Sequence, residues 1–190
     1  MNKEEAIKIV EPFLKRERFE HTLRVADTAV ELATIYNESI EKVEMAAIFH
    51  DYAKYFPLED MKKVILKNDL PKDLFEYHSE LWHGPVASVL VEQEYGIEDH
   101  EIHSAIRYHT TGRANMSMMD KIIFVADYIE PGRNFPGVEE VREMAKQDLT
   151  RSAWMALANT IRFLVSRHAT VYPDTFYAYN DLTKRINGGS

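Results

Sequence analysis

The sequence predicts an all-α protein, a single helical domain of about nine or ten helices. Apolar residues recur at intervals of three and four along most of the 190 residues, which is the spacing of an amphipathic helix. Residues that start or stop helices, such as Asn2, Asn37 and Gly96, stand between these segments. No stretch alternates apolar and polar residues over a useful length, so no strand is predicted.

Each expected helix has a local reason. Asn2 with Glu5, and Ser117 with Asp120, have the spacing of a capping box. Prolines stand at or before the start of several other helices, where a missing backbone N–H costs nothing. Gly96 is expected to close the helix before it. In chain order, the expected helices cover residues 2–12, 20–36, 40–52, 58–68, a short stretch after Pro71, 85–96, 98–109, 118–129, 138–146, 150–169 and a last stretch after Pro173.

Length and composition describe one globular domain. Hydrophobic residues make up 45% and charged residues 28% of the chain, which is typical of a protein with its own core. Cysteine is absent, which excludes disulfides and thiolate-bound metals. The net charge is −8 and no dense basic run is present, so no nucleic-acid partner is expected. No apolar run approaches the ~20 residues of a membrane span, and the N-terminus lacks a signal-peptide pattern. We therefore expect no membrane partner and a cytoplasmic location.

The adjacent pair His50 and Asp51 is the most unusual feature of the chain. It follows the apolar run of residues 43–49, which predicts a buried helix. An imidazole and a carboxylate should not stand side by side there unless something compensates them. We interpret the pair as metal ligands. Lys54, three residues later, is interpreted as a cation that faces a bound anion.

Further candidate ligands stand at comparable positions. His21 opens a helix with an apolar opposite face, and His83 directly precedes a Gly-Pro helix start. His109 ends a helix, and Asp127 interrupts a second apolar run. The C-terminal end of a helix favours a bound cation. Most single histidines are structural or exposed, and this remains the interpretation of His78, His100 and His103.

Together these residues offer more ligands than one metal ion usually binds. A single divalent ion usually takes three or four protein ligands, so a larger set with a carboxylate inside it predicts two ions bridged by Asp51. Mixed nitrogen and oxygen ligands suit iron, manganese or zinc, and the residues do not choose among the three. The six expected metal ligands are His21, His50, Asp51, His83, His109 and Asp127.

The order H…HD…H…H…D on an all-helical chain resembles the HD-domain metal-dependent phosphohydrolases. His83 and His109 match the two additional histidines of the binuclear members. The strings HDYAKYFP, RYHTTGR and ADYIEPGR resemble one branch, the bacterial YqeK-type symmetrical dinucleoside-tetraphosphatases, and the resemblance spans roughly residues 4–182. It implies a core at about residues 17–130 and C-terminal helices over 138–187 that complete a substrate pocket.

The resemblance also implies an activity. The branch holds a di-metal centre, often of iron, and hydrolyses diadenosine tetraphosphate to two ADP. A hydroxide activated by the ions is the expected nucleophile, because metal binding lowers the pKa of water towards ~7. The side chains expected to take part in catalysis are Asp51, Lys54, His83 and His109.

Contacts to the substrate are expected from two parts of the chain. Lys54, Thr110 and Arg133 lie beside metal ligands in sequence and could hold phosphate oxygens. Tyr172, Asp174 and Thr175 could form a base or ribose pocket, or simply cap the core. Four further residues are open to two interpretations. Arg113 could contact phosphate or be a surface residue, and Arg24 could contact phosphate or form an ion pair with Asp27. Trp82 and Phe135 could stack on a base or simply pack.

Three functions remain open at this stage. The first is the symmetrical dinucleoside-tetraphosphatase. The second is another HD-type nucleotide phosphohydrolase, such as a 5′-nucleotidase or a nucleoside triphosphatase, which would share the metal centre and differ in the pocket. The third is a non-catalytic nucleotide-binding module, which loss of a metal ligand would indicate. The oligomeric state is not readable, and a homodimer is allowed.

Overall fold

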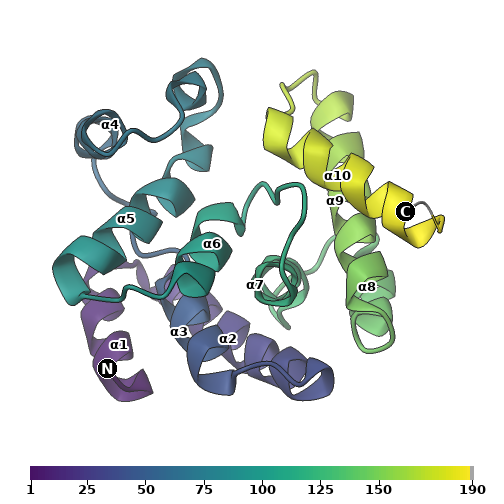
Figure 1. Cartoon of the computed structure of the whole chain (residues 1–190), viewed down its shortest axis with the longest axis horizontal. Coiled ribbons are helices and arrows are strands. Elements are labelled where there is room, and N and C mark those ends of the chain that lie inside the picture. The colour runs from purple at the N-terminus through teal and green to yellow at the C-terminus, as the bar shows by residue number, and fades with distance from the viewer. Residues whose placement is uncertain (189–190) are drawn as a thin grey trace.

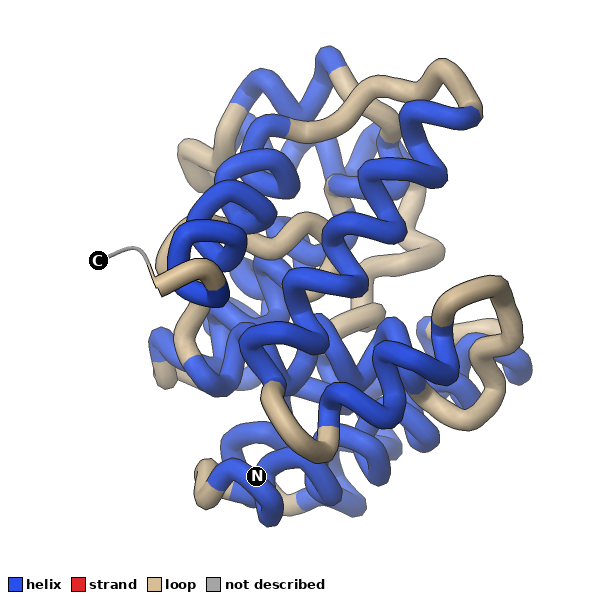
Figure 2. The backbone as a smooth tube through the Cα atoms, turned by 90° about the vertical axis from the view of Figure 1, so that its right-hand side faces the viewer, coloured by secondary structure: helices blue, strands red, loops and turns tan. Residues whose placement is uncertain are grey.

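The computed structural model describes residues 1–188, which form helices and loops and contain no strand (Figures 1 and 2). Three short 3-10 helices accompany the ten α-helices. The α-helices are α1 (Lys3–Val10), α2 (Arg16–Tyr36), α3 (Ile40–Phe49), α4 (Leu58–Lys67), α5 (His83–Tyr95), α6 (His100–Tyr108), α7 (Met118–Ile129), α8 (Val138–Ala145), α9 (Leu149–Ser166) and α10 (Pro173–Ile186). The 3-10 helices are η1 (Glu11–Phe13), η2 (Lys72–Glu76) and η3 (Ser79–Leu81). The prediction of an all-α fold of nine or ten helices is confirmed over the described residues.

Residues that were predicted to start or end helices do so in the structure. Asn2 accepts from the backbone N–H of Glu5 and completes a capping box, and Ser117 and Asp120 complete another. Asn37, which ends α2, has a φ of 55°, and the backbone of Gly96 after α5 is also left-handed. Sequence chemistry therefore sets these four helix ends.

Several predicted boundaries differ from the structure, since α2 begins at Arg16 and α9 ends at Ser166. The difference at the end of α3 matters for the site. We expected a helix over residues 40–52, but α3 ends at Phe49 and turns follow. Within these turns Tyr52 and Lys54 each donate a backbone hydrogen bond to the carbonyl three residues earlier. The adjacent side chains of His50 and Asp51 both reach one centre, where Oδ2 of Asp51 lies 3.1 Å from Nε2 of His50.

Helix α7 lies in the middle of the molecule (Figure 1). Helices α2, α3 and α6 pack against it from one side, and α8 and α9 pack against it from the other. The helix is apolar almost all round, and its buried residues include Ile122, Ile123 and Val125, as expected for a helix without a solvent face. The one carboxylate in its last turn, Asp127, therefore lies near the centre of the fold.

The last two helices form a layer on the far side of α7. Helix α10 packs along α9, where Trp154 stacks on Tyr179 and donates to the hydroxyl of Thr183. This layer runs along α7, since Lys121 near the start of α7 donates to Thr150, and Thr160 lines a cavity with Asp127 near its end. Among residues 1–188, no helix combines the length and the apolar character that crossing a membrane requires.

Candidate metal centre

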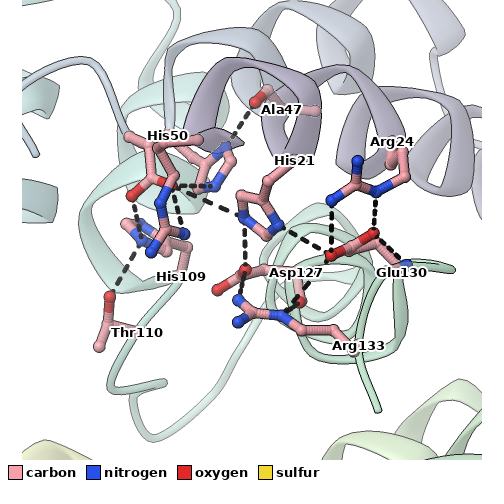
Figure 3. Close-up of polar contacts among 12 residues, drawn as sticks. His21, Arg24, Ala47, His50, His109, Thr110, Asp127, Glu130 and Arg133 are labelled. Carbon is pink, nitrogen blue, oxygen red and sulfur yellow. Dashed lines mark hydrogen bonds and ion pairs between the residues drawn. The ribbon is translucent and has the colours of Figure 1, made fainter. Parts of the chain in front are cut away.

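The structure brings all six predicted metal ligands together. They come from five separate segments: α2, the turn after α3, the start of α5, the turn after α6 and the last turn of α7 (Figure 3). Five of the six are at most 5% exposed, and the side chain of Asp127 is 20% exposed. The members of the cluster are His21, His50, Asp51, His83, His109 and Asp127.

The four imidazoles are oriented in the same way. Each one directs its Nδ1 to an oxygen that accepts a hydrogen bond, so Nδ1 carries the ring proton. The acceptors are Ala47 O for His50 (2.6 Å), Glu80 O for His83 (2.6 Å), Ile106 O for His109 (2.7 Å) and Glu130 Oε1 for His21 (3.0 Å). Each Nε2 is left with a lone pair that faces the centre. This is the arrangement that metal-binding histidines usually have.

Asp51 lies between two pairs of histidines. Its Oδ2 is 3.1 Å from Nε2 of His50 and 3.7 Å from Nε2 of His21. Its Oδ1 is 3.2 Å from Nε2 of His83 and 4.0 Å from Nε2 of His109. A carboxylate whose two oxygens face two separate pairs of ligands has the geometry of a bridge.

The donor atoms fit divalent ions. Nε2 of His21 and Nε2 of His50 are buried without a hydrogen-bond partner. Nε2 of His83 lies 3.0 Å from Nε2 of His109, and with both Nδ1 atoms protonated two lone pairs face each other. A cation removes this repulsion. Ligand bonds of about 2.1 Å at right angles place neighbouring donors about 3.0 Å apart, which is the separation that Nε2 of His21 and Oδ1 of Asp127 have.

Charge near the centre favours the metal-binding forms of His109, Asp51 and Asp127, whereas Asp51, against the effect of burial, raises the pKa of His50. Burial, with the neighbouring rings of His50 and His83, lowers the pKa of His109 to about 3, so that this ring is neutral at pH 7. Burial alone would raise the pKa of Asp51, but His50 and His83 outweigh burial and hold this pKa well below its usual value. The pKa of Asp127 is likewise lowered, by His21 and Arg133 against the effect of burial. Both carboxylates are therefore ionised.

Two guanidinium groups pair with these carboxylates. Arg18 donates to Oδ2 of Asp51 at 3.0 Å, and Arg133 donates to Oδ1 of Asp127 at 2.6 Å and to its backbone oxygen at 2.9 Å. Arg133 is a predicted site residue, whereas sequence reasoning missed Arg18. A signal was available, because Arg18 stands one helical turn before His21 on the same helix face.

Glu130 is a second residue that sequence reasoning missed. We interpreted it only as part of the segment that ends α7, yet it is 2% exposed and holds Nδ1 of His21. Its other oxygen accepts from Arg24 at 2.5 Å and from the backbone of Gly132 at 2.6 Å (Figure 3). Burial alone would raise the pKa of Glu130, but Arg24 and His21 lower it to about 2. The alternative of an ion pair between Arg24 and Asp27 is wrong, because Arg24 binds Glu130 instead.

A glycine controls the approach of two histidine-bearing segments. Gly84 follows His83 at the start of α5, where α5 packs against α6. A Cβ atom there would lie 3.0 Å from the backbone oxygen of Arg107, 3.1 Å from that of Ile106 and 3.3 Å from the ring of His109. Only glycine allows this approach without displacing a neighbour.

The predicted substrate residues lie close to the centre with different partners. Lys54 Nζ pairs with Glu80 at 2.6 Å, directly beside the carbonyl that orients His83. The hydroxyl of Thr110 is 3.0 Å from Nε2 of His109. Arg113 pairs with the buried carboxylate of Asp120 at 2.8 Å, so it acts as an ion-pair residue.

Two cavities adjoin the predicted ligands. The first, the central cavity, has a volume of about 260 Å³ and is lined by His109, Thr110, Asp127 and Arg133. The second, the Tyr172 cavity, has a volume of about 530 Å³. Its lining includes Tyr77, Thr110, Thr160, Tyr172 and Thr175. Two predicted pocket residues, Tyr172 and Thr175, therefore share a cavity with Thr110.

Three other predictions for the pocket have different outcomes. Asp174 lines a small crevice together with Tyr172 and Arg107 and does not line the Tyr172 cavity. Trp82 donates to the backbone oxygen of Leu74 and packs edge-on against Phe75, so it acts as a packing residue. Phe135 lines the central cavity.

The sequence was compared with known proteins. Residues 18–132 match the HD domain family. The chain is 48% identical over 180 residues to a symmetrical bis(5′-nucleosyl)-tetraphosphatase of Bacillus subtilis, covering 95% of this chain and 97% of that protein. It is 43% identical over 188 residues to a protein of the same name from Staphylococcus aureus, again covering 95% and 97%.

A solved structure is similar over nearly the whole fold. It is the 1.50 Å crystal structure of a protein from Clostridium acetobutylicum described as a predicted HD superfamily hydrolase involved in NAD metabolism. The TM-score is 0.92 at 38% identity, and the match covers 97% of this chain and 98% of that one. The HD domain implies a divalent-metal site, and the six-residue cluster includes groups whose donor atoms could hold such an ion. The chain belongs to the HD domain family and, within it, to the symmetrical bis(5′-nucleosyl)-tetraphosphatases.

Proposed function

We propose that this protein hydrolyses diadenosine tetraphosphate symmetrically to two ADP with the help of two divalent ions, which are iron in the native protein. The observation that carries the proposal is the position of Asp51. Each of its oxygens faces two histidines, so one carboxylate can bridge two ions. The names of the relatives supply the substrate class.

The proposed ligand sets follow from the geometry. One ion would be held by His21, His50 and Asp127, whose donor atoms lie within 4.8 Å of one another. The other would be held by His83 and His109, with Asp51 shared between the two ions. Bound ions would supply water of lowered pKa, close to ~7, as a nucleophile for phosphorus.

Local positive charge explains how a protein of negative net charge can bind a polyanion. The chain has a net charge of −8, so local positive charge must attract the tetraphosphate. With ions bound, Asp51 and Asp127 would be neutralised by metal, and Arg18 and Arg133 would be free to donate to phosphate oxygens. Lys54, held against Glu80 beside the centre, would supply a third cation to the substrate. Thr110 would donate its hydroxyl to the same phosphates.

The C-terminal helices would complete the pocket. Tyr172 and Thr175 line the Tyr172 cavity, and this cavity adjoins the central cavity because Thr110 and Thr160 line both. We place one nucleoside of the substrate there, and we place Asp174 beside it at the adjoining crevice. In this view residues 17–130 provide the metal centre, residues 138–187 provide much of the nucleoside site, and the protein acts in the cytoplasm.

A substrate panel tests the proposal. The protein is purified without oxygen, loaded with iron or manganese, and given diadenosine tetraphosphate, ATP, ADP and AMP in separate reactions. We expect ADP as the nucleotide product of diadenosine tetraphosphate and much slower release of phosphate from the mononucleotides. No ADP with either metal, together with rapid phosphate release from a mononucleotide, would instead indicate a nucleotidase or a nucleoside triphosphatase.

A further inference from the structure

A third cavity adjoins the metal centre. It has a volume of about 530 Å³ and lies between the loop after α7 and the surface of α9. Its lining includes Phe135, Asn159 and Phe163, and we name it the Phe163 cavity. It shares Tyr128, Phe135 and Thr160 with the central cavity, so the two adjoin.

The shared residues place the central cavity between the two larger ones. Thr110 joins the central cavity to the Tyr172 cavity, whereas Tyr128 and Phe135 join it to the Phe163 cavity. Thr160 on α9 lines all three. The metal ligands His109 and Asp127 therefore lie between two cavities of equal volume.

The Phe163 cavity has the chemistry of a nucleobase site. Phe163 is 58% exposed, and Phe135 packs edge-on against Tyr128 with ring centroids 5.0 Å apart, so aromatic surface is available for a base. Asn159 offers an amide, and Arg162, which donates to Asn159 at 3.1 Å, adds a positive charge. Stacking on aromatic rings and hydrogen bonds from an amide are the usual means of binding a purine.

The wall of this cavity is held in place by the fold. Arg142 donates to the backbone oxygens of Ile129, Glu130 and Arg133, which fixes the start of the loop after α7. At the end of that loop, Gly137 has a φ of 88°, and a Cβ atom there would lie 3.0 Å from the side-chain nitrogen of Asn159. The loop thus packs tightly on α9, so the cavity is formed before any ligand arrives.

Symmetrical cleavage requires space for a nucleoside on both sides of the reacting phosphorus. Water adds its oxygen to one of the two inner phosphorus atoms, and the bond to the central bridging oxygen breaks. One ADP then carries the new oxygen, and the other leaves with the bridging oxygen and takes up a proton. Each half of the substrate carries one adenosine, so the two adenosines lie on opposite sides of the metal centre.

We propose that the Phe163 cavity binds the second nucleoside of the dinucleotide while the Tyr172 cavity binds the first. The inference rests on the proposed function, because it names where the second half of that substrate lies. It explains selection of a dinucleotide: a mononucleotide fills only one of the two cavities, whereas the dinucleotide gains the contacts of both.

Two enzyme constants test the inference in the metal-loaded protein. For Phe163→Ala and for Phe135→Ala we expect the KM for diadenosine tetraphosphate to rise about tenfold, the effect of losing one base stack. The inhibition constant of adenosine 5′-tetraphosphate, which lacks the second nucleoside, should stay within twofold. Phe163→Trp should keep the wild-type KM because the larger ring still stacks. Tyr177→Ala is the control, since Tyr177 is equally exposed at 58% and lines none of the three cavities.

The outcomes separate this inference from the proposed function. If the wild-type protein forms no ADP from diadenosine tetraphosphate, the proposed function fails. If it forms ADP, but both phenylalanine variants keep the wild-type KM, the second nucleoside does not bind here. The inference would also be overturned if the variants bound the dinucleotide and the one-nucleoside inhibitor more weakly by the same factor, because that would show a general effect on the site.

Discussion

At the scale of single residues, the centre consists of groups that would be costly to bury alone. Asp51 is 1% exposed and ionised, and it is stabilised by Arg18 and by histidines on both of its oxygens. A buried carboxylate without such partners would cost several kcal/mol. The same contacts make Asp51 the residue whose loss should affect both ions.

Replacement of Asp51 tests this directly. Asp51→Ala should abolish hydrolysis of diadenosine tetraphosphate and lower the metal content below one ion per chain, because the shared ligand is gone. The far-ultraviolet circular dichroism spectrum should stay helical, since Arg18 and the histidines can be solvated in the emptied space. Asp60→Ala removes a carboxylate from the solvent-facing side of α4 and serves as the control. Full activity in Asp51→Ala would contradict the bridging assignment.

Lys54 tests the proposed contact with the substrate. Lys54→Ala should leave the metal content unchanged, because Lys54 touches Glu80 and no metal ligand side chain. Turnover should fall at least about tenfold, as expected when one charge-assisted contact of about 1.5–3 kcal/mol is lost. Lys63→Ala, which removes a lysine whose side chain is 75% exposed, should change neither quantity. Unchanged turnover in Lys54→Ala would show that Lys54 has only a structural role.

The sequence predicted the six clustered residues because each is a polar residue inside or beside an apolar run. Arg18 and Glu130 carry no such signal. Arg18 stands in a polar stretch that suits an exposed helix face, and Glu130 stands in a Glu-Pro-Gly segment that suits a helix end. Only the packing of α2 against α7 shows that Glu130 meets His21, and only the packing of α2 against α3 shows that Arg18 meets Asp51.

At the scale of elements, short-range signals predicted where most helices start and stop. Capping boxes, Asn37 and Gly96 act through neighbours in sequence, so they are readable without the fold. The end of α3 at Phe49 is different. It depends on His50 and Asp51 turning toward histidines from other helices, and the sequence of this stretch by itself favours a longer helix.

Gly84 shows how one small residue sets the distance between two elements. Gly84→Ala should push the start of α5 away from α6, because the added Cβ meets two backbone oxygens that cannot move freely. We expect the free energy of unfolding to fall by about 1–3 kcal/mol, the usual effect of overpacking. Denaturant unfolding of the metal-free protein measures it.

The same substitution should also affect the second ion. His83 and His109 would separate, whereas His21, His50 and Asp127 would keep their places. We expect Gly84→Ala to retain about one ion per chain, as His83→Ala should. Two retained ions in Gly84→Ala would show that the approach of α5 to α6 does not control the second site.

At the scale of the whole molecule, the centre joins parts of the chain that are far apart in sequence. Ligands from α2 and α7 and from the segments after α3 and α6 meet at one point (Figure 3). Bound ions would therefore cross-link most of the fold. The cavities were less predictable, because Asn159 and Phe163 on α9 follow the pattern of an ordinary amphipathic helix, and only its packing on α7 places them beside the site.

Removal of the ions should lower the thermal stability without unfolding the protein at 25 °C. Binding to the folded state alone adds about 4 kcal/mol when the free metal concentration is a thousand times Kd. For a chain of this length that corresponds to a Tm change of about 10 °C. The metal-free chain should still fold, since Arg18 and Arg133 pair with the two carboxylates. Differential scanning calorimetry before and after chelation measures the change. An unchanged Tm would contradict the claim that bound ions cross-link and stabilise the fold.

The most direct test of the central claim is the metal content of the wild-type chain purified without oxygen, measured by mass spectrometry against protein concentration. Asp51 as a bridge between two pairs of histidines predicts two divalent ions per chain. A content of one ion per chain, in protein that hydrolyses diadenosine tetraphosphate at its full rate, would contradict the two-ion centre.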